Sequence, residues 1–217
     1  MSTNMLGVTM TAEQSKTKKM KTKLQMKAPT QERSRQTVAT ILEACERIMV
    51  REGFYGVTTD KIAKEAGVSI GSLYQFFGNK ESVVSALIHD MIRKDLLFFQ
   101  EKISSINTLP ADRQVQFLMD LAIEIYSTQR AIRQKIQGIY QYLVDQGEFK
   151  KVIDIYIDTL ARFIIPKDGR DPRVMAQLTI HAFIGLMEQV VVDNPNFIED
   201  EKLVAEIKRM FIRYLCE

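Results

Sequence analysis

Cysteine is scarce in this 217-residue chain, which contains only Cys45 and Cys216. Two cysteines cannot build a disulfide framework or a four-cysteine zinc site, so we expect a reducing compartment. No uninterrupted apolar run reaches the roughly 18 residues of a membrane span, and the first 30 residues lack the apolar core of a secretory signal. We therefore expect a cytoplasmic protein without a membrane segment.

Several enzyme signatures are also missing. The phosphate-binding pattern G-x-x-x-x-G-K and the dinucleotide-binding pattern G-x-G-x-x-G are absent. The two histidines, His89 and His181, have no partner at zinc-site spacing, and no Glu precedes either one at the spacing of a di-iron helix. We therefore expect a protein that is not an enzyme and has no metal and no cofactor.

Proline and glycine are few, with five and ten residues, and the prolines fall between segments whose apolar residues recur every three or four positions. Strand-like alternation never extends beyond a few residues. The pattern predicts an all-α protein with three short helices followed by six longer ones. The predicted helices are Arg33–Glu52, Thr58–Ala66, Ile70–Phe77, Lys80–Ser105, one opening at Pro110, one carrying Ile132 to Leu143 and ending near Gly147, one carrying Ile153 to Ile164, Pro172–Asp193 and Glu199–Leu215.

The net charge of +3 is unevenly distributed. Residues 1–37 contain eight Lys and Arg and two Glu, a sum of +6, so the rest of the chain carries −3. Residues 1–30 form a basic arm that we expect to be disordered and to meet an anionic partner such as DNA. A solvated tail or an added extension without a function has the same composition.

The segment TTDKIAKEAGVSIGSLYQFF, residues 58–77, predicts two short helices joined by a tight turn at Gly67. A small Ala63 allows the helices to cross closely, and Ile62 and Leu73 fill the angle between them. This is a helix-turn-helix, whose second helix enters the major groove of DNA. A helical hairpin that binds nothing has a similar pattern, and the upstream basic arm favours the DNA-binding interpretation.

Residues 35–85 resemble the DNA-binding region of the tetracycline-repressor (TetR) family. The resemblance implies an N-terminal three-helix helix-turn-helix domain over residues 31–79, followed by a six-helix ligand-binding and dimerisation domain over residues 80–217. It also implies a homodimeric repressor that a small molecule releases from a palindromic operator in double-stranded DNA. The matching residues are Gly53-Phe54, Thr58-Thr59, Ile62-Ala63, Ala66-Gly67-Val68-Ser69, Leu73-Tyr74, Phe77 and Lys80-Glu81.

Roles at the DNA follow from the same resemblance. Small residues at the start of the second helix let its backbone approach a phosphate. Arg33 and Arg35 would continue the basic arm along the DNA backbone or minor groove. The implied phosphate contacts are Thr59, Ser69, Ser72, Tyr74 and Lys80, and the implied readers of base edges are Ile70, Gly71 and Gln75.

Two residues depart from the family pattern. Asp60 stands where many relatives offer a hydrogen-bond donor, and Phe76 replaces a more usual Tyr or His. A carboxylate at position 60 repels phosphate, accepts a hydrogen bond from cytosine or points into solvent, and the sequence leaves these alternatives open.

The segment Pro172–Asp193 is apolar on nearly every side, so it must be covered on all sides. A core helix of a monomer satisfies this requirement. We favour a homodimer in which this helix and the last one form a four-helix bundle across a two-fold axis. The predicted interface residues are Leu178, Phe183, Val190, Val191, Ile207, Met210, Phe211 and Tyr214.

An effector pocket is expected among the helices between Pro110 and Asp193, and its apolar composition favours a hydrophobic or amphipathic molecule. Each candidate residue also fits a plain core position. The candidates are Phe99, Phe117, Leu121, Tyr140, Tyr156, His181, Phe183 and Met187. Two other classes remain open at this point: a helical module that binds another protein, and a DNA-binding regulator without an effector. The sequence leaves open the effector, the operator and whether the regulator represses or activates.

Overall fold

The computed structural model describes residues 32–166, 169–194 and 196–216, and these ranges contain helices and no β-strand, which confirms the all-α prediction. The basic arm lies outside the described residues. The α-helices are α2 (Glu32–Gly56), α3 (Thr59–Ala66), α4 (Ile70–Phe76), α5 (Lys80–Ile103), α6 (Ala111–Thr128), α7 (Arg130–Ile136), α8 (Tyr140–Leu143), α9 (Gln146–Ala161), α10 (Pro172–Asp193) and α11 (Glu201–Cys216), with 3-10 helices at Ile106–Thr108 and Phe197–Glu199.

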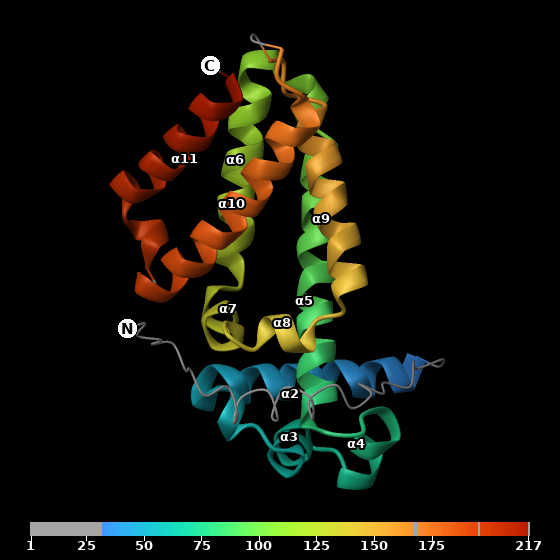
Figure 1. Ribbon diagram of the computed structural model, residues 1–217. Helices are drawn as coiled ribbons and strands as arrows, with labels where there is room; N and C mark the ends of the chain where they lie inside the picture. Colours follow the sequence, from blue (N-terminus) through green and yellow to red (C-terminus); the bar gives the residue numbers. More distant parts are fainter. Residues whose placement is uncertain (1–31, 167–168, 195, 217) are drawn as a thin grey trace, which may run out of the picture.

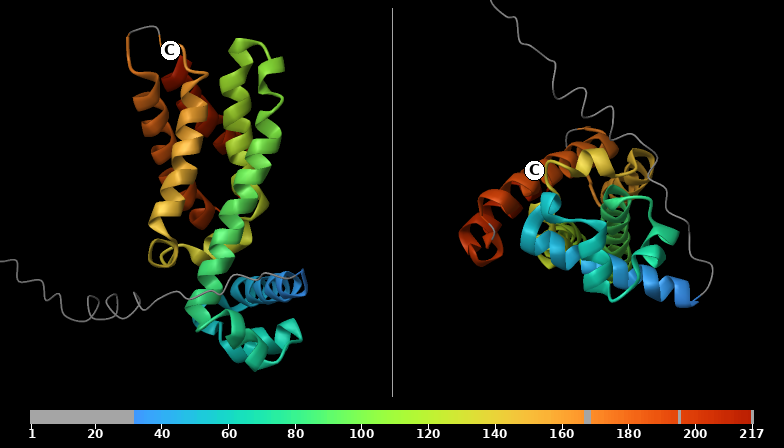
Figure 2. Two further views of the ribbon diagram at one scale, coloured as in Figure 1. Left: turned by 90° about the vertical axis from the view of Figure 1, so that its right-hand side faces the viewer. Right: turned by 90° about the horizontal axis from the view of Figure 1, so that it is seen from below.

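The helices form two bodies that α5 joins (Figure 1). Helices α2, α3 and α4 lie at one end, and α6, α9, α10 and α11 lie at the other. The short helices α7 and α8 lie between the two bodies, directly above α2 in this view. The views in Figure 2 show α3 and α4 at the end of the molecule farthest from α11.

Side-chain caps determine where the helices of the first body begin. Thr58 accepts a hydrogen bond from the backbone N–H of Lys61 at 3.2 Å, and Ser69 accepts one from Ser72 at 3.0 Å. The N–H of Ser82 donates to the side chain of Asn79 at 2.8 Å in a reciprocal capping box. Such caps satisfy backbone donors that a helix leaves unpaired.

One predicted helix is interrupted in the structure. The segment carrying Ile132 to Leu143 was expected to be a single helix, but it forms α7 and α8 on either side of a turn. Gly138 in this turn has a φ of 75°, which a residue with a side chain rarely adopts. Within the described ranges, the chain after α4 therefore forms seven α-helices, α5 to α11, where six were expected.

Each body has its own hydrophobic core. The first core packs α2, α3 and α4 around Leu73 and Phe77, and it extends along α5 as far as Met91. It also includes Ile132 and Ile136 of α7. The second core packs α6, α9, α10 and α11 with the far end of α5. Because α7 packs against both α2 and α10, the two predicted domains share an interface at α7.

Among the described helices, α10 is long and apolar enough to cross a membrane by length and composition, with a mean hydropathy of 1.4. Its buried face includes Met175, Phe183 and Met187, which pack in the second core. One apolar face of α10 is therefore accounted for by packing in the core of a helical domain.

The turn of the helix-turn-helix gives a test of the fold. Gly67 has a φ of 67°, whereas Gly78 is outside the positive-φ region. A Cβ atom added at either position would have no neighbouring atom within 4 Å, so steric clash does not distinguish the two sites. We expect Gly67→Ala to lower the free energy of unfolding by about 1 kcal/mol, because a left-handed conformation penalises a side chain. Gly78→Ala is the control and should be nearly neutral. Urea unfolding measures both, and equal effects would contradict the assignment of strain to Gly67.

Candidate nucleic-acid interface and effector cavity

The outer face of α4 is the exposed surface of the helix-turn-helix. Leu73 is fully buried and holds α4 against the first core. On the opposite side, Tyr74 is 53% exposed, and Ile70 and Gln75 are also exposed. The three side chains are therefore exposed to solvent, and α4, which carries them, lies at the end of the molecule seen from below in Figure 2. An exposed recognition helix of this kind can enter a DNA groove.

Four of the predicted phosphate contacts form two hydroxyl pairs. The Thr59 hydroxyl lies 3.2 Å from the Tyr74 hydroxyl, which joins the start of α3 to α4. The hydroxyls of Ser69 and Ser72 lie 2.8 Å apart at the start of α4. These pairs place hydroxyl donors and acceptors side by side on one exposed surface.

Lys80, at the start of α5, is half-buried. Its Nζ donates to the carbonyl oxygen of Phe54 at 3.3 Å and lies 4.4 Å from the centroid of the Phe54 ring. The ammonium is therefore held against the C-terminal end of α2 by two contacts, and an ammonium has three N–H donors.

The basic side chains of α2 and α3 are largely neutralised within the protein. Arg47 pairs with Glu65 at 3.0 Å, and Lys61 pairs with Glu52 at 2.5 Å. The hydrogen bond from Lys61 lowers the pKa of Glu52. Asp60 is exposed in the first turn of α3, where a carboxylate favours the helix N-terminus. The helix-turn-helix body therefore presents little uncompensated positive charge.

Arg33 and Arg35 are both exposed in the first turn of α2. Arg35 lies 3.9 Å from the carboxylate of Glu32, a loose and exposed pair. Both arginines stand where the chain enters the described part of the protein, at one end of α2 (Figure 1).

The letters Gly67-Val68-Ser69-Ile70-Gly71 also match the G-x-S-x-G pattern of a hydrolase nucleophile. That pattern requires a serine on a turn that follows a strand. Ser69 instead follows α3 and caps α4, and its hydroxyl is bonded within that cap. The geometry is that of a helix-turn-helix and does not build a nucleophile.

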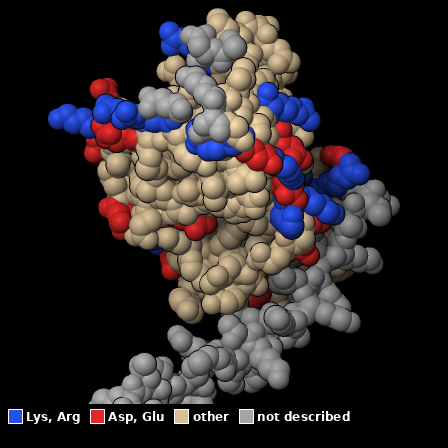
Figure 3. Space-filling model, turned by 45° about the horizontal axis from the view of Figure 1, so that its top comes forward, with Lys and Arg blue, Asp and Glu red and all other residues tan. Residues whose placement is uncertain are grey.

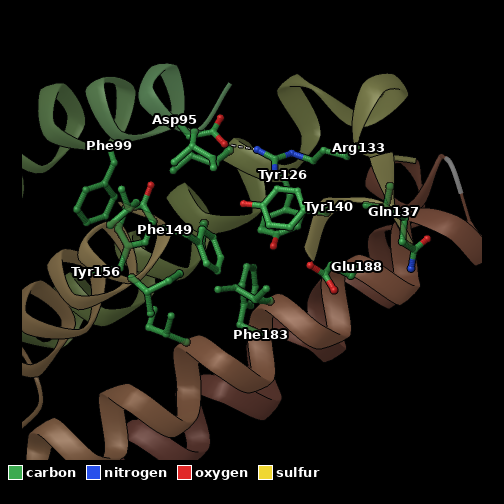
Figure 4. Close-up of a pocket in the computed structure, with 18 of the residues that line it drawn as sticks. Asp95, Phe99, Tyr126, Arg133, Gln137, Tyr140, Phe149, Tyr156, Phe183 and Glu188 are labelled. Carbon is green, nitrogen blue, oxygen red and sulfur yellow. Dashed lines mark hydrogen bonds and ion pairs between the residues drawn. The ribbon is translucent and has the colours of Figure 1, made fainter. Parts of the chain in front are cut away.

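A cavity of about 690 Å³ lies in the second body. Its walls come from α5, α6, α7, α8, α9 and α10 and from the turn between α7 and α8. Figure 4 shows aromatic rings around it, together with two ionised side chains from α5 and α7 and a third from α10. No group of three or more His, Cys, Asp or Glu side chains suited to a metal occurs within the described ranges.

Four of the predicted effector residues line this cavity, namely Phe99, Tyr140, Tyr156 and Phe183. The other four do not line it. Leu121 and Met187 are buried in the second core, and Phe117 packs against that core. His181 is exposed on α10, with its Nδ1 2.7 Å from the carbonyl oxygen of Gln177. These residues share helices with the cavity walls but face other directions.

The polar part of the cavity was missed by the sequence analysis. Asp95 of α5 forms an ion pair with Arg133 of α7 and accepts a hydrogen bond from Gln129 at 2.9 Å. The guanidinium of Arg133 also lies 4.7 Å from the ring centroid of Tyr126. Burial raises the pKa of Asp95, and the positive charge of Arg133 opposes that shift. Asp95 lies four residues from each of the apolar residues Met91 and Phe99 and therefore on the same face of α5. This spacing was a signal in the sequence that Asp95 faces inward.

The predicted dimer residues fall into two groups. Leu178, Met210 and Tyr214 are exposed by 56%, 52% and 36%, and Val190 is half-buried. The remaining four, Phe183, Val191, Ile207 and Phe211, are buried in the core of their own chain. The face in Figure 3 is largely uncharged, and its charged side chains gather toward the edges.

Comparison with known proteins identifies the family. The model for bacterial regulatory proteins of the tetR family matches residues 41–87, and the model for a tetracyclin repressor-like C-terminal domain matches residues 113–215. The chain belongs to the TetR family. The TetR family consists of DNA-binding transcription regulators, so the helix-turn-helix assignment is confirmed.

Individual TetR-family relatives match part of the chain. An uncharacterized HTH-type transcriptional regulator of Mycobacterium tuberculosis is 31% identical over 83 residues, which are 38% of this chain and 41% of the relative. The regulator TtgR of Pseudomonas putida is 39% identical over 62 residues, 29% of this chain and 30% of TtgR. The chain thus spans less than half the length of these curated relatives.

A solved TetR-family structure shows the same fold over most of the chain. It is the transcriptional regulator FadR from Bacillus subtilis in complex with stearoyl-CoA, with a TM-score of 0.57 and 18% identity. The match covers 82% of this chain and 97% of that one. At this identity the likeness concerns the fold.

The buried ion pair gives a test of the cavity. Arg133→Met leaves the Asp95 carboxylate buried without its partner, so we expect the free energy of unfolding to fall by about 3 kcal/mol at pH 8. The loss should be smaller at pH 5, because the Asp95 carboxyl, whose pKa burial raises, binds a proton more readily as the pH falls and is then uncharged. Urea unfolding at both pH values measures this. The control is Asp95→Asn combined with Arg133→Met, which should recover about half of the loss; no recovery would contradict the pairing.

Proposed function

We propose that this protein is a homodimeric transcriptional repressor in the cytoplasm that binds a palindromic operator through α3 and α4. A hydrophobic small molecule that enters the cavity releases it from the operator. The observation that carries this proposal is the combination, in one chain, of an exposed recognition helix and a cavity of about 690 Å³. A helical module that only bound another protein would need neither feature.

Helix α7 supports a coupling between the two sites. Ile132 and Ile136 of α7 pack in the core that holds α2, and Arg133 and Ile136 of the same helix line the cavity. A ligand that prefers one position of α7 therefore shifts α2 relative to α5. Since a ligand shifts an equilibrium only by its difference in affinity for the two states, the effector must bind the released conformation more tightly.

The nature of the effector is supported by the walls and by a structural neighbour. Most lining residues are apolar or aromatic, and the structure of FadR from Bacillus subtilis contains stearoyl-CoA. A molecule with a large apolar part is therefore the expected effector.

The basic arm supplies much of the non-specific DNA affinity in this proposal. The support is the charge of the body itself, where Arg47 and Lys61 are paired with carboxylates. Each phosphate that the arm neutralises adds about one unit to the dependence of log affinity on log salt.

Selection of bound sequences from a random duplex pool tests the proposed DNA binding. The parent chain should enrich a palindrome whose half-sites lie about one helical turn or more apart. Tyr74→Ala with Lys80→Ala should abolish the enrichment, because both side chains are proposed to hold phosphates. His181→Ala, which changes an exposed residue of α10, is the control and should enrich the same palindrome. Failure of the folded parent to enrich any sequence at low salt would contradict the proposal.

The proposed dimer is tested by placing a charge on the exposed face of α10. Leu178 is 56% exposed, and a buried carboxylate at an apolar interface is strongly unfavourable. We expect Leu178→Asp to raise the dimer dissociation constant at least about tenfold, measured by sedimentation. Leu97→Asp is the matched control, since Leu97 on α5 is 52% exposed and lies outside the predicted interface. A parent chain that sediments as a monomer would refute the dimer.

A further inference from the structure

The charge of the cavity lining is unbalanced. Three acidic or basic side chains line it, and two of these, Asp95 and Arg133, neutralise each other. The third is Glu188 of α10, whose carboxylate has no ion pair or hydrogen bond with a described residue and is subject only to the longer-range attraction of Arg133. When all three side chains are ionised, the lining therefore has a net charge of −1.

Glu188 lies where a ligand can reach it. Its side chain is exposed, yet burial on the cavity side raises its pKa, so it stands at the mouth of the cavity. Figure 4 shows its carboxylate directed toward the rings of Tyr126 and Tyr140. The groups that face it there are the two phenols, whose pKa values burial raises, and the guanidinium of Arg133, whose charge Asp95 balances.

Aromatic rings near the carboxylate add a second preference for positive charge. The Tyr140 ring packs edge-on against Phe149, with centroids 5.5 Å apart. The face of such a ring attracts a cation through its quadrupole, and the attraction increases when the cation is desolvated. The guanidinium of Arg133 already lies over Tyr126 in this way, so the same wall holds a cation of the protein itself.

The rest of the cavity is long and apolar. Its lining on α10 extends from Thr179 to Val192, which at 1.5 Å per residue is a length of about 20 Å. Figure 4 shows Phe99 on the side of the cavity away from Glu188. At that end the hydroxyl of Thr179, which is only 2% exposed, has no hydrogen-bond partner among the described residues. One end thus suits a charged head group, and the other suits an apolar body with room for one polar substituent.

We infer that the effector of this cavity is an elongated hydrophobic monocation, with its positive head group at Glu188 and its apolar body extending along α10 toward Thr179. This assignment rests on the proposed function for the role of the cavity, and it specifies the chemical class of the effector. A fatty acid places a carboxylate where Glu188 already supplies a negative charge, and a coenzyme A thioester adds phosphates at the same mouth.

Calorimetric titration of the DNA-free protein tests the inference with four probes of equal chain length: decyltrimethylammonium, 1-decanol, decanoate and decanoyl-CoA. We expect the ammonium probe to bind at least about tenfold more tightly than decanoate. Glu188→Gln should weaken ammonium binding about fivefold, which corresponds to about 1 kcal/mol, and should change decanol binding less than about twofold. The matched control is Glu124→Gln, which removes an exposed carboxylate of α6 that does not line the cavity.

Tighter binding of decanoate or decanoyl-CoA than of the ammonium probe would overturn the inference. It would also be overturned if Glu188→Gln kept the same preference for the ammonium probe over decanoate, or if no probe bound the parent protein. Operator release is measured separately with labelled DNA. If decanoate releases the operator, the proposed function stands and the assignment of a cationic effector is wrong. If the ammonium probe binds tightly through Glu188 but does not release the operator, the cation assignment stands and the proposed mode of regulation is wrong.

Discussion

Helix α7 is the element on which both halves of this protein depend. It is only seven residues long, yet Ile132 and Ile136 are buried in the core around α2 while Arg133 faces the cavity. The ion pair of Arg133 with Asp95 ties α7 to α5, which also extends through both bodies. Because protein interiors are close-packed, α7 cannot move in response to a ligand without displacing its neighbours in the other core. The core around α2 and the lining of the cavity are thereby linked through α7.

Most of the fold could be predicted because its signals are local. Apolar spacing and caps such as Ser69 depend on residues within one helical turn of each other. The break at Gly138 was missed because Ile132, Ile136, Ile139 and Leu143 continue a helical spacing through it. Glycine is compatible with a helix as well as with a positive φ, so only the packing of α7 and α8 against different neighbours determines which occurs.

The site was harder to predict for two physical reasons. A core residue and a cavity residue are both apolar and both inward, so periodicity does not separate Leu121 and Met187 from Phe183. The ion pair joins residues 38 positions apart, and no local pattern reports that α5 and α7 meet. The recognition helix was accessible to prediction because its residues lie within a single 20-residue segment of characteristic order.

The attachment of α4 has a consequence for how such a protein changes over generations. The helix is held by Leu73 and by Phe77 just after its end, both fully buried, while Ile70, Gly71 and Gln75 project outward. Exposed substitutions away from such packing generally alter stability by less than about 0.5 kcal/mol. Mutations on the outer face of α4 can therefore change the surface that this helix presents at little cost in folding. After a gene duplication, the two copies can diverge in that surface while the scaffold and its cavity persist.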